Sequence, residues 1–154
     1  MHKLRVYIDT SVIGGCLDPE FALDSNALFE KFIKGEYVAV LSQTVFDEIR
    51  RAPEEVRALV KKLPEDSVEE VEVTQEALML AETYIRLGVI PDHSYTDAVH
   101  IAVATVHHVD VLVSWNFKHI VNLKRIHGYN SVNLREGFRS LEICSPREVI
   151  YDED

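Results

Sequence analysis

Short segments rich in β-branched residues alternate along this chain with longer segments whose apolar residues recur at helical spacing. The strand-like segments cover residues 4–8, 37–41, 68–73, 109–113 and 141–144. The helix-like segments between them cover residues 21–33, 42–63 with a break at Pro53, 75–87, a segment that opens at Ser94 or Thr96 and has residues 98–104 as its middle, and 122–137. Strands that alternate with helices favour parallel βαβ units, with helices on both faces of the sheet. We therefore predict a three-layer α/β/α fold around a mostly parallel sheet of about five strands.

Local signals place several of these elements more closely. Ser42 is a good helix N-cap, and Gly88 is a good residue to end a helix. Residues 68–73 alternate apolar with acidic side chains, as expected of a strand near the edge of a sheet. Residues 98–104 are apolar almost all round, which predicts a buried helix that opens at Ser94 or Thr96.

The length of 154 residues fits one domain, which we assign to residues 1–150, with residues 151–154 as an acidic, frayed tail. The two cysteines, Cys16 and Cys144, form no close pair or ligand cluster, so the sequence supports neither a disulfide framework nor a zinc site. It shows no signal peptide and no apolar run as long as a membrane helix requires. We therefore expect a cytoplasmic protein.

The charge is uneven along the chain. The net charge of −10 argues against a protein that coats nucleic acid. Residues 115–140 nevertheless hold five basic side chains and one acidic side chain, a net of +4, which leaves −14 for the rest. Aromatic residues are interleaved with these cations: Trp115, Phe117, Tyr129 and Phe138. Such a stretch can hold single-stranded RNA, with Lys118 as our best candidate for a phosphate contact, or it can be core aromatics beside a solvated helix face.

Four polar residues are expected to converge at the carboxyl edge of the predicted sheet. Asp9 directly follows the first strand, and Asn116 follows the fourth. Glu48 lies in the first turns of the helix after the second strand, and Asp97 lies at the start of the most apolar helix. In open α/β sheets the functional site lies at this edge, so we predict a shared site.

Three carboxylates in one site need a cation to offset their repulsion, which is about 4 kcal/mol for a pair 4 Å apart at an effective dielectric of about 20. Oxygen ligands without nearby Cys or His suit Mg²⁺ or Mn²⁺. Such ions in a carboxylate cluster support phosphodiester hydrolysis.

Each of the four residues also has a structural interpretation. Asp9 can cap the turn after its strand. Asp97 can form a capping box with Ser94, and Glu48 can be a surface glutamate beside Arg50 or Arg51. Asn116 can be a loop residue or a helix N-cap. The joint interpretation is stronger, because all four positions fall on the same edge.

Three segments resemble the motifs of PIN domains, the nuclease fold of VapC-type toxins in toxin–antitoxin pairs. The first, third and fourth motifs correspond to Tyr7-Ile8-Asp9-Thr10-Ser11-Val12-Ile13, Asp97-Ala98-Val99-His100-Ile101-Ala102 and Val113-Ser114-Trp115-Asn116-Phe117-Lys118-His119. Their order and spacing match over nearly the whole chain. The resemblance implies a PIN-like fold and a ribonuclease that requires Mg²⁺ or Mn²⁺.

By position, the resemblance implies that Asp9, Glu48 and Asp97 hold metal and that Asn116 stands in the place of a fourth acid. A neutral amide there can orient a water or ligate through oxygen, but it cannot act as a base. The hydroxyls of Thr10 and Ser114 are expected to hold either Asp9 or the scissile phosphate, or to be turn hydroxyls. His100, on the buried helix, is expected to be a core histidine rather than a base.

The resemblance also implies partners: an RNA substrate and a small antitoxin whose amphipathic segment blocks the acids. It implies a homodimer as well, for which Val12, Ile13 and Leu17 are candidate contacts. Two alternatives remain. One is a PIN fold with weak or no catalysis that binds RNA or protein. The other is a phosphatase of the haloacid dehalogenase type, which requires an Asp where this chain has Ser11.

Overall fold

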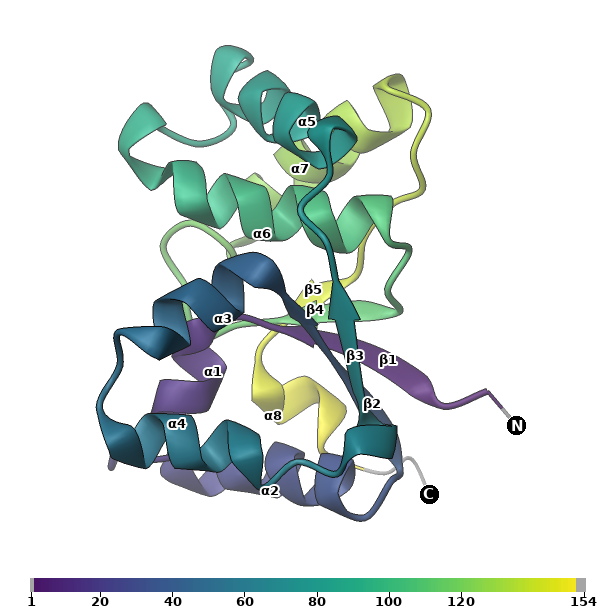
Figure 1. Ribbon diagram of the computed structural model, residues 1–154. Coiled ribbons are helices and arrows are strands. Elements are labelled where there is room, and N and C mark those ends of the chain that lie inside the picture. The colour runs from purple at the N-terminus through teal and green to yellow at the C-terminus, as the bar shows by residue number, and fades with distance from the viewer. Residues whose placement is uncertain (1, 152–154) are drawn as a thin grey trace.

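A five-stranded, wholly parallel sheet forms the centre of the computed structural model, which describes residues 2–151 (Figure 1). The strands are β1 (Leu4–Ile8), β2 (Tyr37–Ser42), β3 (Val68–Val71), β4 (Val111–Val113) and β5 (Ile143–Cys144), in the order β3-β2-β1-β4-β5. The central strand β1 pairs with β2 on one side and with β4 on the other, where Ile8 is level with Val113. All five strands therefore end at one common edge.

Helices cover both faces of this sheet. They are α1 (Thr10–Gly15), α2 (Ala22–Ile33), α3 (Gln43–Arg50), α4 (Glu54–Lys61), α5 (Gln75–Arg86), α6 (Tyr95–Val106), α7 (Leu123–Arg135) and α8 (Pro146–Val149), with short 3₁₀ helices at Glu65–Ser67 and Asp92–Ser94. In Figure 1, α5, α6 and α7 lie above the sheet, whereas α1, α2, α4 and α8 lie below it. The predicted three-layer α/β/α fold is confirmed.

The two most apolar elements form the centre of the core. Val6, Tyr7 and Ile8 of β1 are fully buried, as expected of a strand covered on both faces. Every residue of α6 from position 98 to position 105 is also buried, which confirms the prediction of a buried helix. Because Asp9 directly follows β1 and Asp97 begins α6, the hydrophobic core fixes the positions of both acids.

Other local predictions are confirmed as well. The strand β3 lies at an edge of the sheet. Ser42 is the N-cap of α3 and accepts a hydrogen bond from the backbone N–H of Val45 at 3.4 Å. Gly88 follows α5 with a positive φ of 77°, a conformation that glycine adopts at little cost.

Two short helices, α1 and α8, were not predicted. The segment after β1 was interpreted as a turn, but its residues form α1 with Asp9 as N-cap. As a result Val12 and Ile13 are fully buried, so their predicted role as dimer contacts is wrong; only Leu17 of that set is exposed. Of the predicted tail, residues 152–154 lie outside the described residues. No helix within residues 2–151 is long and apolar enough to cross a membrane.

Candidate active site

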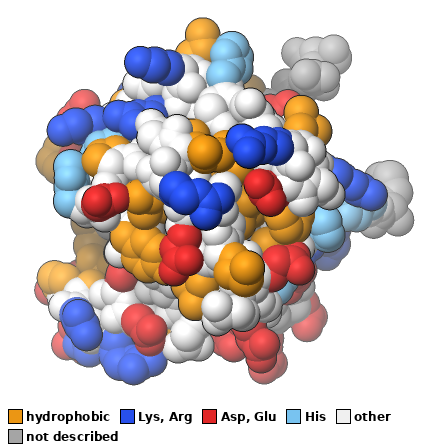
Figure 2. Space-filling model, turned by 90° about the horizontal axis from the view of Figure 1, so that it is seen from above, with side chains coloured by type: hydrophobic (Ala, Val, Ile, Leu, Met, Phe, Trp, Pro, Cys, Tyr) orange, Lys and Arg blue, Asp and Glu red, His pale blue; other side chains and the backbone are white. Residues whose placement is uncertain are grey.

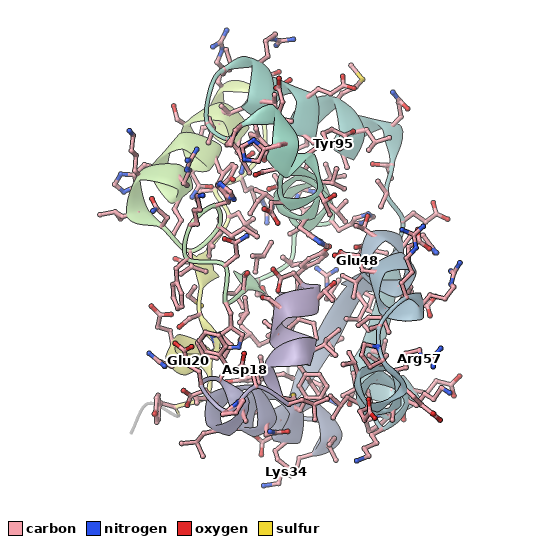
Figure 3. The ribbon with its side chains drawn as sticks, turned by 90° about the vertical axis from the view of Figure 1, so that its left-hand side faces the viewer. Asp18, Glu20, Lys34, Glu48, Arg57 and Tyr95 are labelled. Atoms are coloured by element: carbon pink, nitrogen blue, oxygen red, sulfur yellow. The ribbon has the colours of Figure 1, made fainter. Side chains whose placement is uncertain are left out.

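The carboxyl edge of the sheet brings together side chains from β1, β4, α3 and α6. Figure 3 faces this edge and shows Glu48 between the helices of the two layers. Asp9 follows β1 and Ser114 follows β4, and these two strands are paired. We call Asp9, Glu48, Asp97 and Asn116 the acidic edge.

Asp9 is the most tightly held residue of the acidic edge. It is 4% exposed, and each of its carboxylate oxygens accepts a hydroxyl hydrogen bond at 2.6 Å, Oδ1 from Ser11 and Oδ2 from Ser114. Oδ1 also accepts a longer bond of 3.4 Å from the backbone N–H of Val12, so Asp9 does cap a helix. Capping and site formation are thus compatible, because a carboxylate has about four lone-pair positions.

Ser114 and Ser11 connect Asp9 to the loop after β4. Ser114 is fully buried, and its oxygen also accepts a bond from the backbone N–H of Asn116 at 2.9 Å. Ser11 accepts from the backbone N–H of Trp115 at 3.0 Å. Of the two partners considered for Ser114, its hydroxyl contacts Asp9.

Asp97 is half-buried in the first turn of α6. Its Oδ2 accepts a hydrogen bond from Asn116 Nδ2 at 3.2 Å and lies 3.6 Å from His119 Nδ1. Burial is the largest cause that raises the pKa of Asp97, and the nearby charge of Asp9 raises it further, against opposing effects of His100, His119 and Asn116. Ser94 is at the N-cap position but makes no side-chain capping bond, so the capping-box interpretation fails.

Asn116 uses both ends of its amide within the protein. Its Oδ1 accepts from the backbone N–H groups of Lys118 at 3.2 Å and His119 at 2.9 Å, while its Nδ2 donates to Asp97. The amide therefore holds the loop and orients Asp97. Its oxygen faces the backbone in this structure, which is not the arrangement required to ligate a metal.

Glu48 is held by a chain of buried polar groups. His100 Nε2 lies 3.0 Å from Glu48 Oε1, and His100 Nδ1 lies 2.6 Å from the Tyr7 hydroxyl. The Tyr7 hydroxyl lies 2.7 Å from Ser42 Oγ. Because an ionised carboxylate only accepts, His100 Nε2–H donates to Glu48, and in the neutral ring this leaves Nδ1 to accept from the Tyr7 hydroxyl.

The environment of Glu48 favours its ionised form. Burial raises the pKa of Glu48, but the hydrogen bond and the electrostatic interaction with His100 oppose this, and the net pKa is lowered. The structural interpretation of Glu48 as a surface glutamate beside Arg50 or Arg51 holds in part: Arg50 pairs with Asp47 at 3.1 Å, but the Glu48 side chain is 38% exposed and lies near Arg51. Glu48 lines a hollow of about 390 Å³ together with Thr44, Asp47 and Arg51.

Thr10 provides an unsatisfied group next to Asp9. Its Oγ1 is buried and makes no hydrogen bond of good geometry within the described part of the chain, although it lies near enough to Glu48 to help lower the pKa of that carboxyl. A buried hydroxyl without a partner costs about 1–3 kcal/mol, so such groups usually have a partner in the working state of the protein.

The donor set suits a hard cation that keeps most of its water. Within residues 2–151, no group of three or more His, Cys, Asp or Glu side chains is arranged to hold a metal ion by itself. Mg²⁺ needs less than that, because it commonly binds through one or two carboxylates plus substrate phosphates. Asp9 and Asp97 provide two such carboxylates near enough to influence each other electrostatically. The carboxylates of Asp9 and Asp97 thus fit Mg²⁺ or Mn²⁺ in this mode. The expected absence of nearby histidine is wrong, because His119 lies against Asp97 and His100 against Glu48.

Three contacts of the acidic edge were not predicted from the sequence. They join Ser11 with Asp9, His119 with Asp97, and His100 with Glu48. The first joins two residues that are only two positions apart, so the sequence could have suggested it. The other two join residues that are distant in sequence or separated by a loop, and only the folded chain brings them together.

The basic stretch after β4 is only partly as predicted. Trp115 and Tyr129 are core residues, so they offer no face to a base. Phe117 is 47% exposed, and Lys118 is exposed beside it. The cations remain available, whereas the predicted set of stacking aromatics is reduced to Phe117 and the partly buried Phe138.

The sheet order, the helices on both faces and the acids at the carboxyl edge agree with the predicted PIN-like fold. No protein-family model matches the sequence, and no curated protein matches it. Solved structures do. VapC20 of Mycobacterium tuberculosis, described as a Sarcin-Ricin loop cleaving toxin, is 14% identical with a TM-score of 0.56, over 88% of this chain and 98% of that chain.

A second similar structure is a chain of the VapBC2 complex of Rickettsia felis, bound to a DNA fragment from its promoter. It is 14% identical, with a TM-score of 0.60, over 92% of this chain and 98% of that chain. This chain therefore shares the fold of these two structures, in agreement with the PIN-like fold that the motifs predict.

Proposed function

We propose that this chain is a metal-dependent endoribonuclease that hydrolyses RNA phosphodiester bonds at the acidic edge, in the manner of VapC toxins. The observation that carries the proposal is the convergence of Asp9 and Asp97 at one edge of the sheet, with hydroxyl and amide donors that orient both carboxylates. Orienting groups of this kind around first ligands are typical of metal sites. The similarity to toxin structures supports the same function.

The three acids of the acidic edge form the metal site in this proposal. Asp9 and Asp97 hold Mg²⁺ or Mn²⁺, and Glu48 completes the site from the side of α3. When bound, the metal supplies a water of lowered pKa and offsets negative charge on the phosphate during displacement. Asn116 serves the reaction by fixing Asp97 through Nδ2.

The substrate-facing groups are Thr10 and Lys118. The Thr10 hydroxyl, which makes no hydrogen bond of good geometry and lies near Glu48, is available to a phosphate oxygen. The exposed ammonium of Lys118 binds an RNA phosphate beside the acids. Ser114, which is fully buried, acts on Asp9.

A small antitoxin is the proposed protein partner, and a homodimer is the proposed assembly. The similar VapBC2 structure is a complex, which supports the first part. An amphipathic segment of the antitoxin that covers the acidic edge would exclude RNA from it.

A second candidate function is a PIN-fold binding module without catalysis. Two observations favour it: the Asn116 oxygen is occupied by backbone donors, and no closed group of three metal ligands occurs within residues 2–151. Such a module needs no Mg²⁺ for binding RNA or protein.

Cleavage of a labelled RNA panel by the purified protein in Mg²⁺ or Mn²⁺ tests the proposal. The matched variant is Asp9→Asn, whose side chain keeps the size and one oxygen acceptor of the original, with an EDTA control. We expect metal-dependent cleavage that is lost in the variant and in EDTA. Absence of cleavage by metal-loaded protein free of any partner would favour the binding module, and calorimetric titration with Mn²⁺ would then show whether the acids bind metal at all.

A further inference from the structure

A basic hollow lies between the end of α5 and the start of α7, outside the acidic edge. It has a volume of about 520 Å³, and its cations are Lys118, Lys124 and Arg125. Leu87 and Val89 form an apolar wall, and no acidic residue lines it. On the face that α5, α6 and α7 present, Lys and Arg side chains are spread over the surface, with hydrophobic and acidic side chains between them (Figure 2).

The wall of the basic hollow is built by close contact between α7 and the turn after α5. A Cβ atom at Gly128 would lie 2.8 Å from Val89 Cγ1, so only glycine permits this approach. Arg125 Nη1 donates to the backbone oxygen of Val89 at 2.5 Å, which fixes the guanidinium at the rim. The Asn122 side chain caps the start of α7.

The cations of the basic hollow are free of carboxylate partners. Within residues 2–151, Lys118, Lys124 and Arg125 form no ion pair, whereas Arg5 pairs with Glu69 and Arg147 pairs with Asp24. In a chain of net charge −10, three cations without ion-pair partners around one hollow create a local positive potential that attracts anions.

The basic hollow and the acidic edge share one loop. The backbone N–H of Lys118 donates to Asn116 Oδ1, and Asn116 contacts Asp97. Two residues span at most about 7 Å, so the Lys118 backbone lies within that distance of the acidic edge. His119, between the two sites, contacts Asp97 and is affected electrostatically by Arg125 and Lys118.

We propose that the basic hollow binds one nucleotide of single-stranded RNA next to the scissile phosphate. Its phosphate contacts Lys118, Lys124 and Arg125, and its base packs on Leu87 and Val89. A lysine ammonium acts as a point charge toward phosphate, and the guanidinium keeps unused donors in its fixed plane. The apolar wall beside the cations distinguishes a nucleotide from a simple anion. The link of this site to cleavage rests on the proposed function.

Binding of a short labelled single-stranded RNA in EDTA, at several salt concentrations, tests the proposal without cleavage. The variant is Lys124→Ala, and the control is Lys34→Ala, which removes the same charge from an exposed position at the far end of the molecule (Figure 3). We expect Lys124→Ala to weaken binding about fivefold and to lower the slope of log affinity against log salt by about 0.7. Equal effects of the two variants would overturn the proposal.

A second variant tests the apolar wall. Leu87 is exposed, so Leu87→Ser should fold normally. We expect it to weaken binding of the RNA and of adenosine 5′-monophosphate but not of inorganic phosphate. If Leu87→Ser leaves all three unchanged, or if an acidic peptide competes as well as the nucleotide does, then the site is a general anion site and the nucleotide assignment is wrong.

The two proposals fail separately. Selective loss of RNA binding in Lys124→Ala, without any metal-dependent cleavage by the parent protein, would sustain the basic hollow and remove the nuclease. If the parent protein cleaves RNA, and Lys124→Ala binds and cleaves RNA as well as the parent does, the nuclease would be sustained and the nucleotide site in the basic hollow would be removed.

Discussion

At the scale of single residues, Asn116 decides what the acidic edge can do. Its Nδ2 donates to Asp97 and its Oδ1 accepts from two backbone N–H groups, so the amide serves two neighbours of opposite character. A carboxylate at position 116 would still accept hydrogen bonds from the two backbone N–H groups. It would repel the carboxylate of Asp97 instead of donating a hydrogen bond to it. A fourth acid therefore requires a cation between positions 116 and 97, whereas the amide does not.

Exchange of this amide for an acid tests the argument. We expect Asn116→Asp to lower the free energy of unfolding by about 1–3 kcal/mol in EDTA, because it places a carboxylate against Asp97. The same variant should bind Mn²⁺ more tightly than the parent protein. Urea unfolding with and without Mn²⁺ measures both effects. The control, Asn116→Ala, loses both hydrogen-bonding roles, so it should be destabilised in EDTA and should gain less stability from Mn²⁺ than Asn116→Asp does, because Asp97 is no longer oriented. Equal stability of Asn116→Asp and the parent in EDTA would show that the amide of Asn116 is not required beside Asp97.

The chain of polar groups behind Glu48 is the second feature at this scale. The Tyr7 hydroxyl is buried between Ser42 Oγ and His100 Nδ1, and burial raises the pKa of Tyr7, so the hydroxyl stays protonated. Tyr7→Phe leaves His100 Nδ1 without its partner, and we expect the free energy of unfolding to fall by about 1–3 kcal/mol. Urea unfolding at unchanged m-value measures this loss.

Tyr37→Phe is the matched control for the tyrosine hydroxyl. Tyr37 donates to the backbone oxygen of Val149 at 2.7 Å at a partly buried position. Its loss should cost less than that of Tyr7, about 0.5–1.5 kcal/mol, because water can reach the groups left behind. A Tyr7→Phe cost no larger than the Tyr37→Phe cost would mean that the His100 chain contributes little.

At the scale of elements, the helices and strands that could be predicted from the sequence are those with a long and regular pattern of apolar residues. The five strands and the helices of ten or more residues follow from apolar patterns. The helix α1 does not, because Thr10, Val12, Ile13 and two glycines are poor helix formers. It forms because Asp9 caps it and because its apolar side chains are buried in the core, which are tertiary effects.

The same reasoning applies to the acidic edge. Its members were predictable, because each follows the end of a strand or begins a helix. The orientation of the Asn116 amide and the contact of His100 with Glu48 were not predictable, because they depend on how α3, α6 and the loop after β4 pack together.

The two adjacent glycines of α1 give a prediction for this element. A Cβ at Gly15 would lie 2.6 Å from Ser25 Oγ and 2.8 Å from Trp115 Nε1, two atoms that are hydrogen-bonded to each other at 2.8 Å. We expect Gly15→Ala to reduce the free energy of unfolding by about 1–3 kcal/mol. A Cβ at Gly14 would meet nothing within 4 Å, so Gly14→Ala should stabilise the protein by about 0.5–1 kcal/mol. Thermal unfolding of the pair measures the difference, and a shift of the same sign in both would contradict the packing of α1 against Trp115.

At the scale of the whole molecule, the uneven charge separates two surfaces along one loop. Asp9 after β1 and Asp97 at the start of α6 repel each other and attract cations. The side chains of Lys118, Lys124 and Arg125 attract phosphate instead. A nucleic acid strand that crosses the loop after β4 meets both. Repulsion at the acidic edge lowers the stability of the metal-free protein, so a divalent cation that binds there must stabilise the whole domain.

This linkage can be measured without any activity. A ligand that binds only the folded chain stabilises it by about 2.7 kcal/mol at a concentration of about 100 times its Kd. For a chain of this size, 1 kcal/mol corresponds to about 2–4 °C in Tm, so saturating Mn²⁺ should raise the Tm by about 5–10 °C. We expect Asp97→Asn to lose most of this increase and Glu20→Gln to retain it, since Glu20 is exposed and lies apart from Glu48 (Figure 3). An equal increase in both variants would place the stabilising cation away from the acidic edge, and no increase in the parent protein would favour the binding module over the nuclease.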